Sequence, residues 1–343
     1  MRSLFFVSSP LEMISAIEAR RKFNSQENVL VLYLFEKDKP IVEYIKSLND
    51  PWKKIYYIDR DYDNLGQRWI DYLKRIKKYK FDFLFTSSMP FSAHFFFNIK
   101  YKKYYFLDDG TLTLTNVTHF KKEKNLKKQL SLFIAEGKTS LKFKKKELKY
   151  FLKGHTLRGN IKKLSLFTFF DIPTTRNIEI VKNELNWFTS IKKEKKISIL
   201  KNTVYIIGSS MSDEKIISKE YYFELLSRIQ KQFELSSIYY IPHRWEKDEK
   251  IKEIQQIFNF TIKPNKSIIE IDFIINNEIP EIIVGTISTA LFTLQKLYPE
   301  STIYSTSVDI ERILSKKCAI KAILSYQKNQ FLKIAIPQTK LDK

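Results

Sequence analysis

The chain has 343 residues, a length that predicts two domains or one large one, and its hydrophobic fraction of 43% can build a sizeable core. It holds only seven glycines and neither a P-loop nor a GxGxxG pattern, which excludes a glycine-rich phosphate loop. The single cysteine, Cys318, excludes an internal disulfide framework and a thiolate metal cluster.

The formal net charge of +22 predicts attraction to an anionic partner: nucleic acid, a membrane surface or an acidic substrate. A lysine-rich composition with mostly solvated lysines is the competing explanation. No zinc finger or RNA-recognition pattern is present, so we expect no specific nucleic-acid partner. A nonspecific nucleic-acid-binding protein remains an alternative.

The first half of the sequence alternates between strand-like and helical patterns. Expected strands are Leu4–Val7, Val29–Phe35, Lys54–Ile58, Phe81–Phe85 and Tyr104–Leu107. Expected helices are Pro10–Phe23, Pro40–Leu48, Gln67–Tyr79 and one that begins at Pro90. Such alternation is typical of a parallel sheet with right-handed crossovers.

The alternation breaks between about His119 and Lys163, where lysines are crowded, and then resumes. The later strands are Thr203–Ile207, Ile238–Ile241, Thr261–Lys263 and Ile282–Val284, and the later helices are Lys219–Phe233, Asp248–Phe258 and Ala290–Leu297. We therefore expect an α/β protein of two Rossmann-like domains, residues 1–165 and 166–343, whose parallel sheets face one another across a cleft. Nucleotide-sugar glycosyltransferases of the GT-B type are built this way.

The segment Ser237–Glu246 places polar side chains directly after a strand. Pro242 ends the strand because it has no N–H for a sheet ladder, and His243 and Arg244 follow. Ligands of open α/β sheets bind at the carboxyl ends of the strands, which makes His243 a candidate catalytic residue. An ordinary loop histidine is the competing explanation.

Other expected strands also end in candidate groups. Asp108 and Asp109 precede Gly110, a pattern suited to acid/base work on a substrate hydroxyl or, alternatively, to a simple turn. Gly208 and Ser209 end another strand, with Asp213 a few residues later.

The expected helix at Ala290 follows a hydroxyl-rich turn that contains Gly285, Thr286, Ser288 and Thr289. Hydroxyls and free N–H groups at a helix amino terminus can bind a phosphate. A plain Ser/Thr cap of the helix is equally consistent with the pattern.

Taken in their order along the chain, these motifs resemble those of the bacterial lipooligosaccharide and capsule sialyltransferases, glycosyltransferase family 52. Asp108–Asp109–Gly110 is similar to the acidic–acidic–Gly motif of the family, and Tyr240–Arg244 to its histidine motif. Glu270 and the pair Ser288–Thr289 lie where related enzymes hold CMP. One difference is that proline precedes His243, whereas it follows the histidine in the usual motif.

The resemblance implies an inverting transferase that moves sialic acid from CMP-sialic acid to a galactose-type acceptor on lipooligosaccharide or capsule. It implies that His243, Arg244, Glu270, Ser288 and Thr289 lie at the CMP part of the donor. We expect Gly208, Ser209, Gly285 and Thr286, in the turns after neighbouring strands, to bind CMP with them. His243 would assist departure of the phosphate. We expect no cofactor and no metal. The family also contains glucosyltransferases, so another nucleotide-sugar donor is an alternative.

The carboxylate base that takes the acceptor proton is left open between Asp213, slightly favoured, and Asp108 or Asp109. Leu4–Val7 is too short for a signal peptide, and no apolar run reaches the length of a membrane span. We therefore expect a cytoplasmic enzyme that meets a glycan acceptor, with the basic stretch free to bind an anionic membrane surface peripherally. Whether the chain forms a homodimer is left open.

Overall fold

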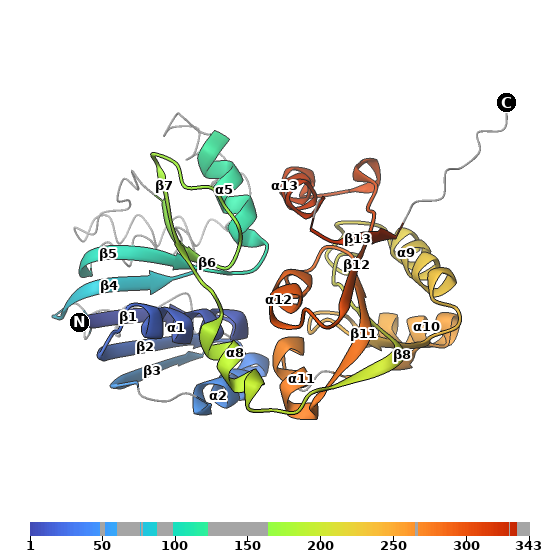
Figure 1. The fold of residues 1–343 in the computed structure, drawn as a ribbon. Helices are drawn as coiled ribbons and strands as arrows, with labels where there is room; N and C mark the ends of the chain where they lie inside the picture. Colours follow the sequence, from blue (N-terminus) through green and yellow to red (C-terminus); the bar gives the residue numbers. More distant parts are fainter. Residues whose placement is uncertain are drawn as a thin grey trace. The chain divides into compact units, whose positions relative to one another are not determined.

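The computed structural model describes residues 1–48, 52–59, 76, 78–87, 99–122, 164–264, 267–328 and 330–334. The chain divides into two compact units, the first of Met1–Asp109 with Asn116–Phe188 and the second of Gly110–Thr115 with Thr189–Lys343 (Figure 1). Each is an α/β unit with a parallel sheet, so the fold class is the expected one. The division falls after Phe188, whereas the sequence placed it after residue 165.

The first unit contains a seven-stranded sheet with the order β3-β2-β1-β4-β5-β6-β7, in which every pair is parallel. Its strands are β1 (Arg2–Val7), β2 (Glu27–Leu34), β3 (Lys54–Asp59), β4 (Lys80–Thr86), β5 (Lys100–Leu107), β6 (Leu164–Thr168) and β7 (Ile178–Lys182). The last two strands were not expected from the sequence. They extend the first sheet past residue 165 and account for the later boundary.

Connecting helices in the first unit are α1 (Pro10–Lys22), the short η1 (Glu36–Asp38) and α2 (Lys39–Ser47). Two helices, α5 (Leu112–Lys122) and α8 (Asn186–Lys193), run across the division between the units. Ser9 begins α1, because its hydroxyl accepts the backbone N–H of Glu12, and Pro10 occupies the first helical position. This cap fixes α1 directly after the end of β1.

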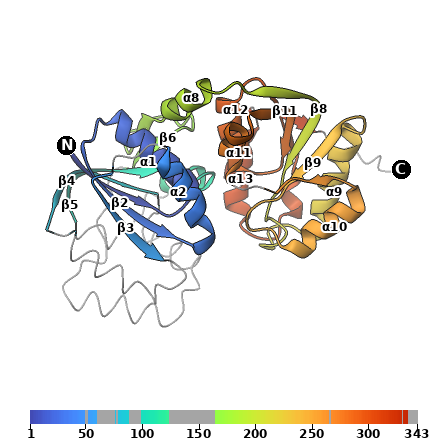
Figure 2. The same ribbon diagram turned by 90° about the horizontal axis from the view of Figure 1, so that it is seen from below.

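The second unit repeats the same winding, with the parallel order β10-β9-β8-β11-β12-β13. Its strands are β8 (Ser198–Ile207), β9 (Ser237–Ile241), β10 (Thr261–Ile262), β11 (Glu278–Gly285), β12 (Thr302–Thr306) and β13 (Leu332–Ile334). Its remaining helices are α9 (Lys219–Gln232), α10 (Asp248–Phe258), α11 (Ile269–Asn276), α12 (Thr289–Leu297), the short η3 (Ile310–Arg312) and α13 (Lys317–Gln327). Helices α9 and α10 cover one face of this sheet, and α11 and α12 cover the other (Figures 1 and 2).

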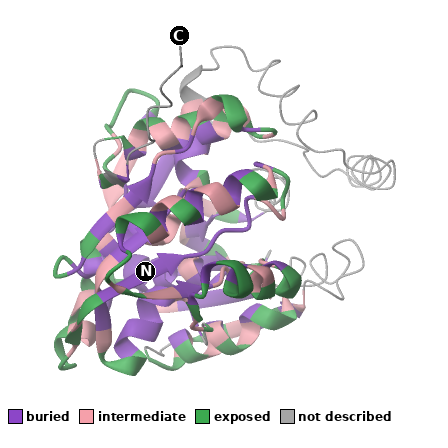
Figure 3. Cartoon of the chain, turned by 90° about the vertical axis from the view of Figure 1, so that its right-hand side faces the viewer, coloured by how far each residue is buried: buried purple, intermediate pink, exposed green. Residues whose placement is uncertain are grey.

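Central strands such as β1 and β11 are largely buried (Figure 3), which explains their nearly continuous apolar sequences. In each sheet the direction of winding reverses at one point: between β1 and β4 in the first unit, and between β8 and β11 in the second. Parallel α/β sheets bind ligands outside the carboxyl ends of the strands at such a reversal. The topology therefore selects one candidate location in each unit.

Several expected features lie outside the described residues. They are most of the helix expected at Gln67–Tyr79, the helix expected from Pro90, and the basic stretch beyond Lys122. Among the helices that the structure describes, none is long and apolar enough to cross a bilayer.

Candidate functional site

The turn after β8 lies at the reversal point of the second sheet and depends on a glycine. The N–H of Gly208 donates to the carbonyl oxygen of Ile241 at 2.8 Å. A Cβ atom at Gly208 would clash with Oε2 of Glu246 and with this same carbonyl oxygen. Only glycine lets the turns after β8 and β9 approach this closely.

Ser209 is buried, and its N–H, hydroxyl and carbonyl groups form hydrogen bonds within the protein. Its N–H donates to the Tyr222 hydroxyl at 3.0 Å, and its hydroxyl accepts the N–H of Met211 at 3.3 Å. Its carbonyl oxygen accepts from Nζ of Lys250 at 2.8 Å. The turn is therefore held in a fixed shape.

The turn after β11 supplies hydroxyls at the amino terminus of α12. Ser288 is the N-cap, and its hydroxyl accepts the N–H of Ala290 at 3.2 Å, while Thr289 is the first helical residue. Thr286 is buried, and its carbonyl oxygen accepts from Gln327. A Cβ atom at Gly285 would press on the side chain of Leu291. The cap explanation is correct for Ser288, and the phosphate site at this helix amino terminus stays a prediction.

His243 lies in the turn after β9, where both its backbone and its ring are bound. Its N–H donates to Oε2 of Glu246 at 2.6 Å, and its ring Nδ1 accepts the N–H of Trp245 at 3.3 Å. An Nδ1 that accepts a hydrogen bond places the proton of neutral imidazole on Nε2. Nε2 of His243 can thus act as a hydrogen-bond donor. Arg244 is exposed beside it, with its guanidinium 5.9 Å from the ring centre of Trp245.

Asp213 is held in a buried ion pair. Its Oδ2 lies 2.6 Å from Nζ of Lys250, and the two side chains are 9% and 6% exposed. Lys250 also pairs with Oε1 of Glu246 at 2.6 Å. A carboxylate already bound to a buried ammonium is poorly placed to accept a proton from a substrate.

Glu270 lies in the first turn of α11 and is 5% exposed. Its Oε1 accepts from the Thr293 hydroxyl, and burial raises its pKa. The structure therefore places Glu270 inside the second unit, between α11 and α12, rather than on its surface.

In the first unit, Asp108 and Asp109 follow β5, but they have different surroundings. Asp108 is fully buried, and its carboxylate accepts from the Thr168 hydroxyl at 2.6 Å and from the N–H of Phe169 at 2.7 Å. It ties the end of β5 to the end of β6. Asp109 is partly exposed. Gly110 follows with φ of +63°, a left-handed conformation that favours glycine, so the turn explanation of this motif is correct for its backbone.

The structure adds Glu12, which sequence reasoning missed. Glu12 lies at the reversal point of the first sheet, 1% exposed, and its carboxyl accepts the N–H of Ser8 at 2.6 Å and the Ser8 hydroxyl at 2.9 Å. Burial raises its pKa to about 8, and the charge of Asp109 acts in the same direction, against the donors of Ser87 and Ser8. The Ser9-x-x-Glu12 capping pattern was the available signal.

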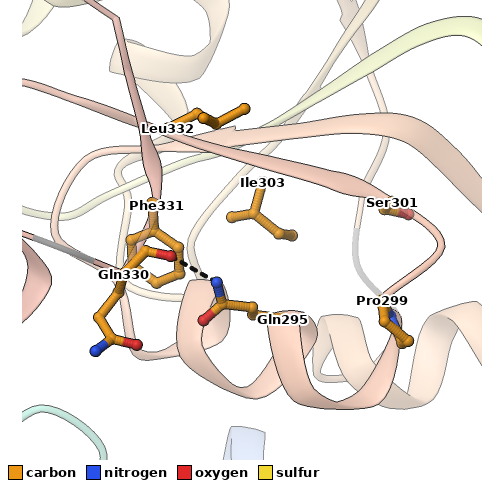
Figure 4. A pocket seen from close by; sticks show the side chains of 7 residues that line it. All are labelled: Gln295, Pro299, Ser301, Ile303, Gln330, Phe331 and Leu332. Atoms are coloured by element: carbon orange, nitrogen blue, oxygen red, sulfur yellow. Dashed lines mark hydrogen bonds between the residues drawn. The ribbon is translucent and has the colours of Figure 1, made fainter.

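Two further features lie apart from these residues. Among the described residues, no three His, Cys, Asp or Glu side chains gather as they would around a metal ion. A shallow pocket of about 460 Å³ is formed by α12, β12 and the start of β13, where Nε2 of Gln295 donates to the carbonyl oxygen of Gln330 at 2.6 Å (Figure 4). It contains none of the predicted site residues.

No protein-family model and no curated protein matches this sequence. Solved structures do. UDP-GlcNAc 2-epimerase from Methanocaldococcus jannaschii, in complex with UDP-GlcNAc and UDP, matches at a TM-score of 0.51 and 12% identity over 89% of this chain and 83% of that chain. This likeness shows a common fold, and the winding of the two sheets defines its type. The chain has a GT-B fold.

Two glycosyltransferase structures match at lower TM-scores. The alpha/beta-galactoside alpha-2,3-sialyltransferase of Photobacterium phosphoreum matches at 0.48 and 13% identity, over 97% of this chain and 98% of that chain. The E. coli heptosyltransferase WaaC with ADP matches at 0.44 and 11% identity, over 96% of this chain and 98% of that chain.

Proposed function

We propose that the protein is an inverting glycosyltransferase that uses a nucleotide-sugar donor, and that this donor is CMP-sialic acid. The observation that carries the proposal is the arrangement at the reversal point of the second sheet. There, the turns after β8 and β11 flank the reversal, and His243 follows the neighbouring strand β9. This is the location at which doubly wound sheets bind nucleotides.

The groups in this location suit a phosphate leaving group. The amino terminus of α12, capped by Ser288, supplies a positive dipole end and free N–H groups. Nε2 of His243 supplies a directed donor. As the bond between the anomeric carbon and the phosphate oxygen breaks, these donors stabilise the electron pair that leaves with CMP.

The acceptor hydroxyl attacks the anomeric carbon from the opposite face and must give its proton to a base. We propose Asp109 for this role. Asp213 is bound by the buried Lys250, and Asp108 is fully buried against Thr168 and Phe169, whereas Asp109 follows β5 and is partly exposed. The acceptor is proposed to be a galactose-type sugar of a lipooligosaccharide or capsule, as the sequence resemblance implies.

A donor assay tests the proposal. The protein is incubated with CMP-sialic acid and lactose, and CMP release and the sialylated product are both measured. We expect transfer by the wild type, a loss of about 10²–10³-fold in His243→Ala, and normal transfer in Leu235→Ala, an exposed control position. Normal turnover by a folded His243→Ala protein would refute the role of His243.

A second candidate is a nucleotide-sugar epimerase, because the epimerase of M. jannaschii shares the fold. The same assay includes UDP-GlcNAc as a separate substrate, with the products followed by proton NMR. Epimerisation of UDP-GlcNAc without transfer from CMP-sialic acid would replace our proposal with this one.

We also propose that the basic stretch contacts an anionic membrane surface, where a lipid-linked acceptor would lie. Each lysine near such a surface contributes about 1 kcal/mol, and the attraction falls with salt. Liposome flotation should show binding that needs anionic lipid and weakens when Lys121, Lys122, Lys127 and Lys128 become glutamine. Equal recovery of both proteins would rule out this role.

A further inference from the structure

Lys250 is an unusual lysine for its place in the chain. It lies in the first turn of α10, where the helix dipole disfavours a positive charge. It is also only 5% exposed, although lysine is almost never buried without a charged partner. Both features indicate that its contacts, rather than the helix, explain its position.

Those contacts use every donor that an ammonium group has. Nζ of Lys250 lies 2.6 Å from Oε1 of Glu246 and 2.6 Å from Oδ2 of Asp213. It donates to the carbonyl oxygen of Ser209 at 2.8 Å and lies 3.1 Å from the hydroxyl of Ser212. The ring centre of Tyr222 is 4.5 Å away. With its donors taken, Lys250 is unsuited to touch a substrate itself.

Glu246 carries this network to the backbone of His243. Its side chain is fully buried, which raises its pKa, while the charge of Lys250 lowers the pKa and favours the carboxylate. Oε1 of Glu246 also accepts the Tyr240 hydroxyl at 2.6 Å, and Oε2 accepts the N–H of His243 at 2.6 Å. Glu246 therefore connects the ammonium of Lys250 to the backbone of the turn that carries the His243 imidazole.

The same network reaches the turn after β8 by a second route. The Tyr240 hydroxyl lies 2.8 Å from the Tyr222 hydroxyl, which accepts the N–H of Ser209. Glycine at position 208 leaves the space that Glu246 occupies. Two turns that follow neighbouring strands are therefore joined through buried polar groups.

We propose that Lys250 is a positioning residue for His243, with Glu246 as the link, and that Asp213 is a structural anion of Lys250 rather than the base. The proposal rests on the proposed role of His243 in transfer. Loss of the ammonium would leave two buried carboxylates next to each other, and their repulsion would displace the turn that holds His243. A displacement of about 1 Å in a catalytic group can cost about 10²-fold in rate.

The test compares Lys250→Met with Lys252→Met, an exposed lysine on the same helix. Protein labelled with isotopes in histidine is studied by NMR, and His243 is assigned from the signal missing in His243→Ala. In the wild type and in Lys252→Met we expect the neutral form of the His243 ring to carry its proton on Nε2. In Lys250→Met we expect this tautomer preference to be lost and kcat to fall by about 10²-fold, with little change in KM for the acceptor.

Two more variants make the outcome decisive. Glu246→Gln keeps the side-chain shape and removes one charge, so it should also change the His243 signal, even if Lys250→Met does not fold. Asp213→Asn should lower kcat by less than about tenfold, whereas loss of a general base costs about 10²–10⁴-fold. A wild-type His243 signal in folded Lys250→Met or Glu246→Gln would overturn the positioning role. Absence of transfer in the wild type would instead overturn the proposed function, and the NMR comparison would still decide the positioning role.

Discussion

Both units bury carboxyl groups at the carboxyl ends of their strands, but they do so with different partners. In the first unit, Glu12 is bound by the backbone and hydroxyl of Ser8, and Asp109 repels its charge. In the second, Glu246 and Asp213 share the ammonium of Lys250. Glu12 therefore holds its proton up to a pH of about 8, whereas the charge of Lys250 offsets part of the rise in pKa that burial gives Glu246.

Depth of burial alone does not set the charge of these carboxyl groups. Glu12 and Glu246 are both buried, and burial raises the pKa of each. The neighbouring charge decides the rest: a like charge adds to the effect of burial on Glu12, and an opposite charge offsets it for Glu246. The first unit thus contains a carboxyl group that titrates near neutral pH, whereas the second contains a network of ion pairs around Lys250.

The largest expected effect is a pH dependence of stability that comes from Glu12. Between the ordinary pKa of 4.5 and the folded value of about 8, the folded protein keeps a proton that the unfolded chain has lost. The contribution of Glu12 is therefore fully present below 4.5 and is lost as pH rises to about 8. Its size is on the order of 5 kcal/mol at most.

Glu12→Gln tests this, because glutamine resembles the neutral acid and does not titrate. The free energy of unfolding of both proteins is measured by urea titration at a series of pH values. The variant should gain stability relative to the wild type as pH rises, and then hold that advantage at alkaline pH. A difference between the two proteins that is constant with pH would show that folding does not raise the pKa of Glu12.

Lys250→Met should come next in size. It leaves Glu246 and Asp213 buried without their cation, and breaking such a pair costs about 3–5 kcal/mol. Lys252→Met on the same helix should change stability by less than about 0.5 kcal/mol. Thermal unfolding of the two variants checks this, and equal melting temperatures would mean that the buried network stabilises nothing.

Thr168→Val should have an intermediate effect on stability, through a third buried carboxyl group, that of Asp108. Valine keeps the shape of threonine but removes the hydroxyl that donates to Asp108 at 2.6 Å. A hydrogen bond to a charged group contributes about 1.5–3 kcal/mol. Urea titration measures the loss, and an unchanged midpoint would contradict the role of Asp108 in joining β5 to β6.

How much the sequence revealed differs between the fold and the site. Apolar runs identified β1, β2, β8 and β9, because buried parallel strands have a continuous apolar sequence. Because ligands of parallel sheets bind at the carboxyl ends of the strands, the sequence also indicated His243, which lies directly after β9. Strands β6 and β7 were missed, since they follow the lysine-rich stretch at which the expected first domain ends.

The buried network could not be predicted in full. Glu246 and Lys250 are four residues apart, and their pairing was visible in the sequence. Asp213 is 37 residues from Lys250, and only the adjacency of β8 and β9 brings it near. Likewise, the Ser9-x-x-Glu12 cap was visible, but the closeness of Glu12 to Asp109 depends on the order of β1, β4 and β5.

The smallest expected effect compares the serine caps of the two units. Ser9 caps α1 and Ser288 caps α12, so alanine at either position should cost about 1 kcal/mol of stability. Only Ser288→Ala should also weaken CMP binding, measured by calorimetry. Equal CMP affinity in Ser288→Ala and Ser9→Ala would remove the α12 amino terminus from the proposed donor site.

Hydrogen–deuterium exchange with and without CMP tests the proposed donor site, because it locates the nucleotide without assuming any catalysis. We predict slower exchange in three segments, the turns after β8, β9 and β11, which contain Ser209, His243 and Ser288. A matched experiment with UDP compares the two nucleotides. Unchanged exchange in these turns at saturating CMP, or protection confined to the first unit, would contradict the proposed donor site.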